Sequence, residues 1–397
     1  MTDAKPVYQA PFFEGAEKKV EIRFHVEVGD PSGMRDLPVS AWSAVLGRGG
    51  VEIISSIHGR DWDAYVLSES SLFVSRTRIV CKTCGQSAPL FVLEDVMQLC
   101  GTVGCHVRTV IFSRSNLLDH TQQQPVHRSF ASERKFLDDL LQVTGAFYVF
   151  GDVSGTHWNL YTATVPAASG TDPVKDEAYP ATLEMAMYGL DQAVATSKWW
   201  KHSTEDAVAC RVKSGLAAML PGPGVQWDDY VFNPCGYSMN AIDEEGAYYT
   251  VHVTPQDGCS FASFETSATG SRCALFIETA LSIFKPTTVS ISLLNAEDSA
   301  QIGASELPIL HNRYGFTMDS DCKQNLCISN YFGRGSHHFR SYTSLDASLV
   351  IKPDAGKNVE NRFNQVNQAN RAILNSYSSM EVGSGVMMKG SQGTSRL

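Results

Sequence analysis

Short stretches of alternating hydrophobic and polar residues recur along the first half of the chain. From Lys19 to Glu27, every second residue is Val, Ile or Phe, and the residues between them are ionisable. Because successive side chains of a strand point to opposite faces, this stretch predicts a half-buried strand. Runs rich in β-branched and aromatic residues predict further strands at residues 51–57, 64–67, 78–82, 107–112, 146–150 and 158–163.

Helical spacing separates these predicted strands. The hydrophobic residues between positions 136 and 141 recur as they do on one face of a helix. Further helices are predicted at residues 89–99, 182–194 and 273–284, and further strands at 248–254, 261–265, 288–294 and 326–332. The chain therefore belongs to a mixed α and β class. Residues 167–178 resemble a loop between two halves, and residues 351–397 resemble a tail whose last twenty or so residues are expected to be disordered.

Composition narrows the possible partners. The 397 residues include 43% hydrophobic ones, enough for a large buried core. No apolar segment suits a secretory signal or a membrane helix, and the ten cysteines follow no regular spacing, as in a reducing compartment. A cytoplasmic protein without a membrane partner is predicted. The net charge of -10, with no basic block, argues against nucleic acid and favours a cationic small molecule.

The stretch Tyr65 to Val74 allows two interpretations. As local structure, it is a strand, a polar turn and a second strand. As chemistry, a hydroxyl held in a strained turn at Ser70 can attack the carbonyl of Glu69, and the resulting ester can be opened by β-elimination. The new amino end would then be a pyruvoyl group, an electron sink of the kind that amino-acid decarboxylation needs. No convincing lysine motif for pyridoxal phosphate accompanies it.

Four separated motifs carry a family resemblance. They are FFEGAEK at 12–18, YVLSESSLFVS at 65–75 followed by KTCG at 82–85, FNPCGYSMN at 232–240, and VHVTP at 251–255. In this order they resemble eukaryotic S-adenosylmethionine decarboxylase over residues 11–350. The tail after residue 350 lies outside the resemblance.

The resemblance implies an α+β fold, a four-layer α/β/β/α sandwich of two antiparallel sheets flanked by helices. Residues 1–350 would form a single domain with similar halves at 1–165 and 180–350. The chain would cut itself into 1–69 and 70–397 and decarboxylate S-adenosylmethionine, the product serving as aminopropyl donor for spermidine and spermine. The pyruvoyl group from Ser70 would form a Schiff base with the substrate, with no metal and no pyridoxal phosphate. A monomer or a homodimer of processed units is expected.

The resemblance also assigns roles to individual residues. Cys84 matches the proton donor, and a free thiol with a pKa near ~8.5 is largely protonated at neutral pH. Ser238 and His252 match residues that act in self-processing, and a neutral imidazole is a suitable base for the serine α-hydrogen. The remaining matches are Phe13 and Phe232 around the adenine, Glu69 in substrate binding, and Glu14 and Glu17 as acids required for activity.

Two departures from the family pattern lead to predictions. Gln256 stands where many relatives carry a glutamate that contacts ribose, which predicts weaker substrate binding than in a Gln256→Glu variant. The acidic cluster that binds putrescine in animal relatives corresponds to a set of four residues, Glu21, Thr182, Glu184 and Glu265. An aspartate of that cluster falls at Pro180, so we expect this diamine site to be a remnant and putrescine to have little effect.

Other classes of protein were weighed against this enzyme. A catalytically dead paralogue could act as a regulatory subunit of a decarboxylase. The presence of all four processing and catalytic residues, Ser70, Cys84, Ser238 and His252, argues against this alternative. A hydrolase using Ser238 or Cys84 with His252 would lack a G-x-S-x-G elbow. Cys81 and Cys84 form a CxxC pair, but without a second pair a metal site is not expected.

Overall fold

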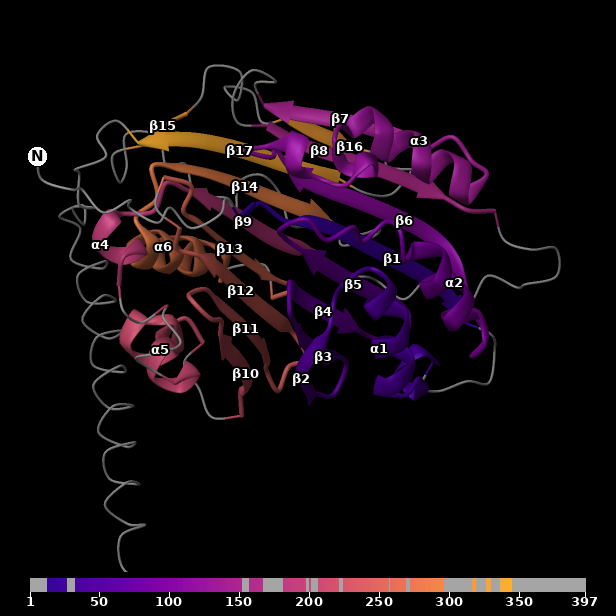
Figure 1. Ribbon diagram of the computed structural model, residues 1–397, viewed down its shortest axis with the longest axis horizontal. Coiled ribbons are helices and arrows are strands. Elements are labelled where there is room, and N and C mark those ends of the chain that lie inside the picture. The colour runs from indigo at the N-terminus through magenta and orange to yellow at the C-terminus, as the bar shows by residue number, and fades with distance from the viewer. Residues whose placement is uncertain are drawn as a thin grey trace, which may run out of the picture.

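The computed structural model describes residues 13–26, 33–151, 157–166, 181–197, 200, 206–220, 224–256, 258–268, 272–295, 316–318, 326–329 and 336–344. Two antiparallel β-sheets lie between two groups of helices (Figure 1). Figure 1 shows α1, α2 and α3 on one flank of the molecule and α4, α5 and α6 on the other. The expected α+β sandwich is confirmed.

The first sheet has the strand order β2-β3-β4-β5-β1-β6-β8-β7. Its strands are β1 (Lys18–Val26), β2 (Ile53–His58), β3 (Asp63–Leu67), β4 (Ser70–Val74), β5 (Arg78–Thr83), β6 (Cys105–Ser115), β7 (Ala146–Gly151) and β8 (His157–Thr164). The central pair is β5 with β1. On its other edge β1 pairs with β6, and the register of that pair shifts between Arg23 and Phe24.

The second sheet has the strand order β10-β11-β12-β13-β9-β14-β17-β15, with β16 also paired to β17. Its strands are β9 (Thr182–Tyr188), β10 (Gln226–Val231), β11 (Tyr237–Ile242), β12 (Tyr248–Thr254), β13 (Phe261–Thr266), β14 (Thr288–Asn295), β15 (Phe316–Met318), β16 (Leu326–Ser329) and β17 (Ser336–Ser344). When β9 is matched to β1, β10 to β2 and so on through β14, the two sheets have the same strand order. The halves therefore share a topology.

The helices are α1 (Val39–Arg48), α2 (Leu93–Gly101), α3 (Phe130–Leu141), α4 (Gln192–Ala195), α5 (Ala207–Ser214) and α6 (Cys273–Phe284). Local signals set their ends. The Ser129 hydroxyl accepts the Ser132 N–H at the start of α3, and Gly215, with φ 93°, ends α5.

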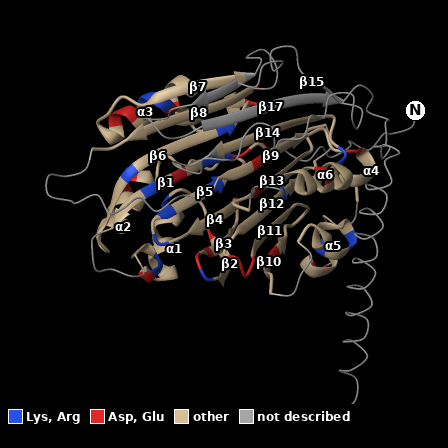
Figure 2. Cartoon of the chain, turned by 180° about the vertical axis from the view of Figure 1, so that it is seen from behind, with Lys and Arg blue, Asp and Glu red and all other residues tan. Residues whose placement is uncertain are grey.

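Each sheet has a hydrophobic face toward its own helices and a mostly polar face toward the other sheet. Leu183, Met185 and Met187 of β9 pack in the core beneath α6, whereas Thr182 and Glu184 point to the first sheet. Figure 2 shows Lys, Arg, Asp and Glu on strands in the middle of the molecule, as well as on its outer helices. Two small apolar clusters lie between the sheets on either side of this charged centre. One contains Phe261 and the other contains Phe73.

Most predicted elements are confirmed to within a few residues, but the helix predicted at residues 182–194 is wrong. Residues 182–188 form strand β9, paired with β13 and β14, and only Gln192–Ala195 are helical. Leu, Glu, Met and Ala favour helices intrinsically. Here the pairing on both sides and the two-residue alternation of core and inter-sheet positions override that preference.

Candidate functional site

The turn between β3 and β4 holds Ser70 in a strained conformation. Leu67 pairs with Ser70, leaving Ser68 and Glu69 as the two turn residues. Ser70 has φ 107°, a region that residues with a side chain rarely adopt. Glu52, the residue before β2, fixes the turn from outside, because Ser68 N–H donates to Glu52 O at 2.8 Å and Glu52 N–H donates to Ser68 Oγ at 3.0 Å.

The groups around the Glu69–Ser70 bond match the chemistry of an acyl shift. The buried Ser70 hydroxyl donates to Glu17 Oε1 at 2.9 Å. The carbonyl oxygen of Glu69 accepts the N–H of Cys84 at 3.3 Å. A proton acceptor therefore contacts the nucleophile, and a hydrogen-bond donor polarises the carbonyl that the nucleophile would attack.

His252, on β12, reaches this site from the second sheet. Its Nδ1 lies 2.5 Å from Glu17 Oε1, the same oxygen that accepts the Ser70 hydroxyl. A proton on Nδ1 satisfies Glu17 and leaves Nε2 as the basic nitrogen. Ser70 and His252, far apart in sequence, thus meet at one carboxylate oxygen.

Three further hydroxyl groups surround the imidazole. Nε2 lies 2.8 Å from Ser71 Oγ and 3.2 Å from Thr250 Oγ1, and Nδ1 lies 3.4 Å from Ser263 Oγ. Ser71 Oγ also lies 2.7 Å from Asn240 Oδ1, and its single hydroxyl proton is donated either to this oxygen or to Nε2. The sequence analysis missed Ser71, Asn240 and Ser263 as site residues, although the alternation of polar residues on β11 and β13 was available as a signal.

Ser238 lies beside this group on β11. Its Cα position is paired with that of His252 in the β11–β12 ladder, and its side chain is buried. Two-residue alternation puts Ser238 on the same strand face as Asn240, which faces the first sheet. The structure therefore brings both residues predicted to act in processing to the inter-sheet layer.

Electrostatics keep Glu17 ionised. Burial alone would raise its pKa, but the charge of Lys82, 3.1 Å away, and the His252 side chain outweigh burial and hold that pKa well below its usual range. Glu17 is a carboxylate in contact with the Ser70 hydroxyl.

The Cys84 thiol is a firmly protonated group. Burial raises its pKa well above the usual range, the negative charges of Glu69 and Glu17 raise it further, and a hydrogen bond with Ser70 offsets part of this effect. The sequence analysis expected an ordinary thiol, so the structure changes that expectation toward a weaker acid. Its CxxC neighbour Cys81 packs in the core between the first sheet and its helices.

The segment before β1 connects the two sheets. Glu14 Oε2 accepts the N–H groups of Leu118 at 2.7 Å and Asp119 at 3.1 Å, and Glu14 Oε1 accepts that of Ala16 at 3.2 Å. The N–H of Phe13 donates to Gln256 Oε1 at 2.9 Å. Glu14 and Gln256 therefore hold this segment in place through the backbone.

Phe13 and Glu69 meet over Gly85. A side chain at Gly85, which has φ +60°, would come within 2.5 Å of Glu69 Oε2 and 2.8 Å of the Phe13 ring. Phe13 is 37% exposed, whereas Phe232, after β10, is partly buried and its ring lies 4.9 Å from that of Tyr230. Glu69 Oε2 is buried and has no hydrogen-bond partner among the described residues. Burial raises the pKa of this carboxyl to about 7, with Lys18 opposing the rise.

The four residues of the predicted diamine site all have partners. Lys82 Nζ contacts Glu184 at 2.9 Å and Glu265 at 2.8 Å. Lys19 Nζ lies 2.8 Å from Glu265 Oε1 and 3.5 Å from Glu184 Oε2. Sequence analysis missed both lysines, although Lys19 and Lys82 stand on strands that are otherwise buried.

Arg78 occupies the other end of the diamine cluster. Its Nη2 donates to Glu21 at 2.8 Å and to Thr182 Oγ1 at 2.9 Å. Burial would raise the pKa of Glu21, but Arg78 and Arg23 outweigh it and hold the pKa well below its usual range. Pro180, where an aspartate was expected, lies outside the described residues.

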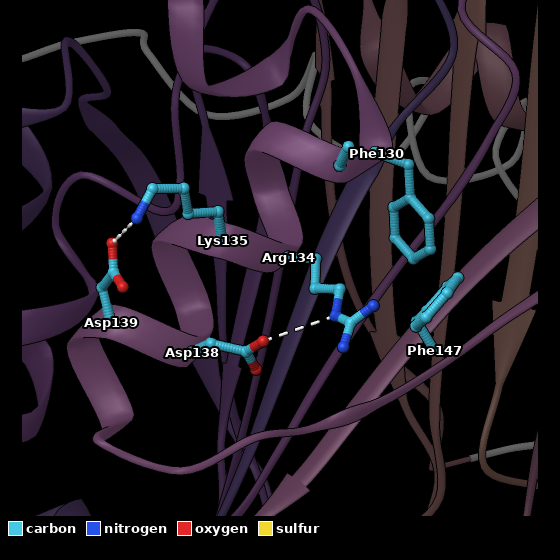
Figure 3. A pocket seen from close by; sticks show the side chains of 7 residues that line it. Phe130, Arg134, Lys135, Asp138, Asp139 and Phe147 are labelled. Carbon is cyan, nitrogen blue, oxygen red and sulfur yellow. Dashed lines mark hydrogen bonds and ion pairs between the residues drawn. The ribbon is translucent and has the colours of Figure 1, made fainter.

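A surface hollow of about 360 Å³ lies away from this site (Figure 3). It is lined by Phe130, Ala131, Arg134, Lys135, Asp138, Asp139 and Phe147. Arg134 and Lys135 are paired with Asp138 and Asp139, so their charges are already compensated. None of the predicted site residues lines the hollow.

Within the described residues, no group of three or more His, Cys, Asp or Glu side chains has the arrangement of a metal site. Among the helices of the same residues, none has the length and hydrophobicity needed to cross a bilayer.

Comparison with known proteins identifies relatives along most of the chain. The profile of the family "Adenosylmethionine decarboxylase" matches residues 10–343. The S-adenosylmethionine decarboxylase proenzyme of Dictyostelium discoideum is 34% identical over 86% of this chain and 88% of its own length. That of Drosophila melanogaster is 36% identical over 69% and 80%, and that of Vicia faba 34% over 80% and 89%.

A solved structure has a similar fold. The crystal structure of the Trypanosoma brucei AdoMetDC-delta26 monomer superposes with a TM-score of 0.50 and 25% sequence identity, covering 69% of this chain and 99% of the other. The fold and the sequence comparisons thus agree.

Proposed function

Because the chain belongs to the adenosylmethionine decarboxylase family, its reaction is the decarboxylation of S-adenosylmethionine, and we propose that it makes the carbonyl this reaction needs by cutting itself between Glu69 and Ser70. The observation that carries the proposal is the strained Ser70, whose hydroxyl contacts the Glu17 carboxylate. The Cys84 N–H on the Glu69 carbonyl supports the same step.

In the first step, Glu17 accepts the proton of the Ser70 hydroxyl as Oγ attacks the carbonyl carbon of Glu69. The Cys84 N–H stabilises the negative charge that develops on the carbonyl oxygen. The carbon–nitrogen bond then breaks, the nitrogen of residue 70 takes up a proton, and an ester joins Glu69 to the Ser70 side chain. Relief of the strained φ at Ser70 favours this direction.

In the second step, His252 removes the α-hydrogen of residue 70 through its basic nitrogen. The ester oxygen leaves with the α-carboxylate of Glu69, which becomes the new carboxyl end of the first fragment. Water then replaces the nitrogen of residue 70, which departs as ammonia, and a pyruvoyl group remains. The polar residues around His252, including Ser71 and Asn240, hold the imidazole for this transfer.

The pyruvoyl carbonyl supplies the electron sink that decarboxylation requires. The chain's own residues bind and orient the substrate around it. Phe13 and Phe232 offer faces for the adenine and, near the sulfonium, for its positive charge. Glu69 places a carboxyl beside Phe13, and Cys84 returns a proton to the substrate carbon after carbon dioxide leaves. The product is the aminopropyl donor for spermidine and spermine.

Intact mass and a labelled substrate test the proposal together. Purified protein should separate into residues 1–69 and 70–397, the larger fragment blocked by a pyruvoyl group, and should release labelled carbon dioxide from carboxyl-labelled S-adenosylmethionine. Ser70→Ala should remain one chain without activity, whereas Ser43→Ala, at an exposed position on α1, should behave as wild type. A full-length wild-type chain with an unmodified serine would contradict the proposal and favour a dead regulatory paralogue.

We also propose, as the sequence predicts, that putrescine has little effect on the activity. Two lysines already face the carboxylates of Glu184 and Glu265 inside the protein. Burial would raise the pKa of Glu265, but Lys19 and Lys82 outweigh it and lower the pKa to about 2. The ammonium groups of Lys19 and Lys82 already pair with these carboxylates, so a diamine would have to compete with them for binding.

A further inference from the structure

Lys18 is a buried ammonium with only neutral partners. It is the first residue of β1 and its side chain is completely buried. Its Nζ donates to the carbonyl of Gly85 at 3.0 Å and to Gln123 Oε1 at 3.0 Å. Among the described residues, no carboxylate lies within ion-pair distance of Nζ. A buried charge without a counter-ion is costly, so its retention calls for a reason.

The groups that face Lys18 identify what its charge acts on. Burial lowers the pKa of Lys18 to about 8, and the groups that oppose this effect are, in order, Cys84, Glu14, Glu133 and Glu69. Glu133 and Glu14 are already engaged, Glu133 by Arg114 and His127 and Glu14 by three backbone N–H groups. Of the four groups, the Cys84 thiol and the Glu69 carboxyl are left for Lys18 to act on, and both belong to the candidate site.

The thiol needs such a charge at one moment of the reaction. When Cys84 gives its proton to the substrate carbon, a thiolate is left beside Glu69 and Glu17, whose negative charges disfavour it. The other two buried lysines of the site already have carboxylate partners: Lys82 is shared among three carboxylates, and Lys19 lies beside Glu184 and Glu265. Among the described lysines of the site, Lys18 is the one whose charge no carboxylate pairs, so it can stabilise the thiolate.

We propose that Lys18 is the positioning residue of the proton donor: it anchors the Cys84–Gly85 turn through the Gly85 carbonyl, and its charge stabilises the thiolate left on Cys84. This inference rests on the proposed function. Gln123 holds the ammonium from the other side, so the side chain has one orientation.

The first test needs no catalysis. In a Ser70→Ala background, which keeps the chain whole, Cys84 is alkylated by iodoacetamide at fixed pH and followed by peptide mass spectrometry. Cys235 and Cys259, which are also partly exposed, serve as internal references. Lys18→Met should slow alkylation of Cys84 about tenfold relative to the references, the effect of raising its pKa by about one unit.

Two control variants separate charge from packing. Lys18→Arg keeps the charge and should retain most of the Cys84 reactivity. Lys135→Met removes an exposed lysine of α3 and should change nothing. The inference is overturned if Cys84 reacts equally fast with Lys18 and with Lys18→Met. It is also overturned if Lys18→Met and Lys18→Arg slow the reaction equally, because the loss of shape rather than of charge would then explain the effect.

The second test follows the proton during turnover. The proton can instead reach the former carbonyl carbon of residue 70. Water then releases the decarboxylated substrate, without its nitrogen, as an aldehyde. The nitrogen stays on residue 70, which becomes alanine. The 70–397 fragment then gains about 1 Da, the difference between pyruvoyl and alanine. Lys18→Met should lower kcat more than it raises KM and should increase the alanine formed per turnover several-fold. An unchanged ratio in an active, self-cleaved variant contradicts the inference.

Failure of the proposed function is distinguishable from failure of this inference. A wild-type chain that never acquires a pyruvoyl group contradicts the proposed function, and the alkylation test still measures the effect of Lys18 on Cys84. A wild-type chain that turns over, with Cys84 unaffected by Lys18→Met, contradicts only the role of Lys18.

Discussion

The Nε2 atom of His252 lies 2.8 Å from the hydroxyl oxygen of Ser71, the residue that follows Ser70. Ser71 belongs to the first sheet and His252 to the second, so the contact joins the two sheets beside the Glu69–Ser70 bond. Asn240 fixes the same hydroxyl at 2.7 Å. The orientation of the imidazole therefore depends on the residue that directly follows Ser70.

Replacing Ser71 should impair the second step of self-processing. Ser71→Ala removes one hydrogen bond from His252, and we expect about two- to tenfold slower release of the two fragments, the range that the loss of one such bond predicts. Because the first step does not use Ser71, the ester should accumulate. Hydroxylamine, which cleaves esters, should then cut the variant at residue 70, as gel electrophoresis over time would reveal. Cleavage at the wild-type rate would show that Ser71 does not orient the base, and Ser43→Ala is the matched control.

Removing Lys19 should create a response to diamines. Lys19→Met leaves Glu184 and Glu265 with one ammonium group fewer, and an added diamine can replace it. We expect low basal activity that millimolar putrescine raises several-fold, while wild type and Lys135→Met respond little. Steady-state rates with and without putrescine provide the measurement. Several-fold activation of the wild-type enzyme would refute the proposal that the protein's own lysines occupy this site.

Glu14 should affect substrate binding more than self-cleavage. Its carboxylate accepts three backbone N–H groups, whereas the amide nitrogen of a glutamine cannot accept them. Glu14→Gln should loosen the segment that carries Phe13 and raise KM by about tenfold or more, as expected for hydrogen bonds to a charged group. Self-cleavage, measured by intact mass, should proceed. An unchanged KM would exclude this role, and Glu94→Gln on the exposed face of α2 is the control.

The variant Gln256→Glu should bind substrate more tightly than wild type. Gln256 Oε1 accepts the N–H of Phe13 at 2.9 Å and the thiol of Cys259 at 3.3 Å. A glutamate keeps that acceptor and adds a negative charge and a second oxygen for a ribose hydroxyl. A lower KM is expected, with Gln98→Glu as the control for charge alone. An equal or higher KM would contradict the prediction.

The carboxyl of Glu69 should make substrate binding depend on pH near neutrality. Burial raises its pKa to about 7, so the group is largely neutral below that pH and ionised above it. An ionised carboxylate attracts the sulfonium, and KM should therefore fall as the pH rises from 6 to 8. In Glu69→Gln this part of the pH dependence should disappear. The prediction fails if KM of the two proteins changes in parallel over that range.

The sequence alone was sufficient for the family, the reaction and most of the local structure. Motifs such as that around Ser70 are contiguous, and the alternation that predicts β1 is a property of neighbouring residues. The same locality explains the error at residues 182–194, where helix-favouring residues form β9 because strands from elsewhere in the chain pair with both of its edges.

Only the tertiary structure decided how charges are distributed in the site. Lys19 and Lys82 meet Glu184 and Glu265 across the two sheets, and Ser70 and His252 meet at Glu17, although these residues are far apart along the chain. Hydrogen bonds and pKa values depend on which atoms lie within a few ångströms and on how far water is excluded. Sequence order contains neither quantity, so it could not reveal that Lys18 lies beside Cys84 with no carboxylate partner among the described residues.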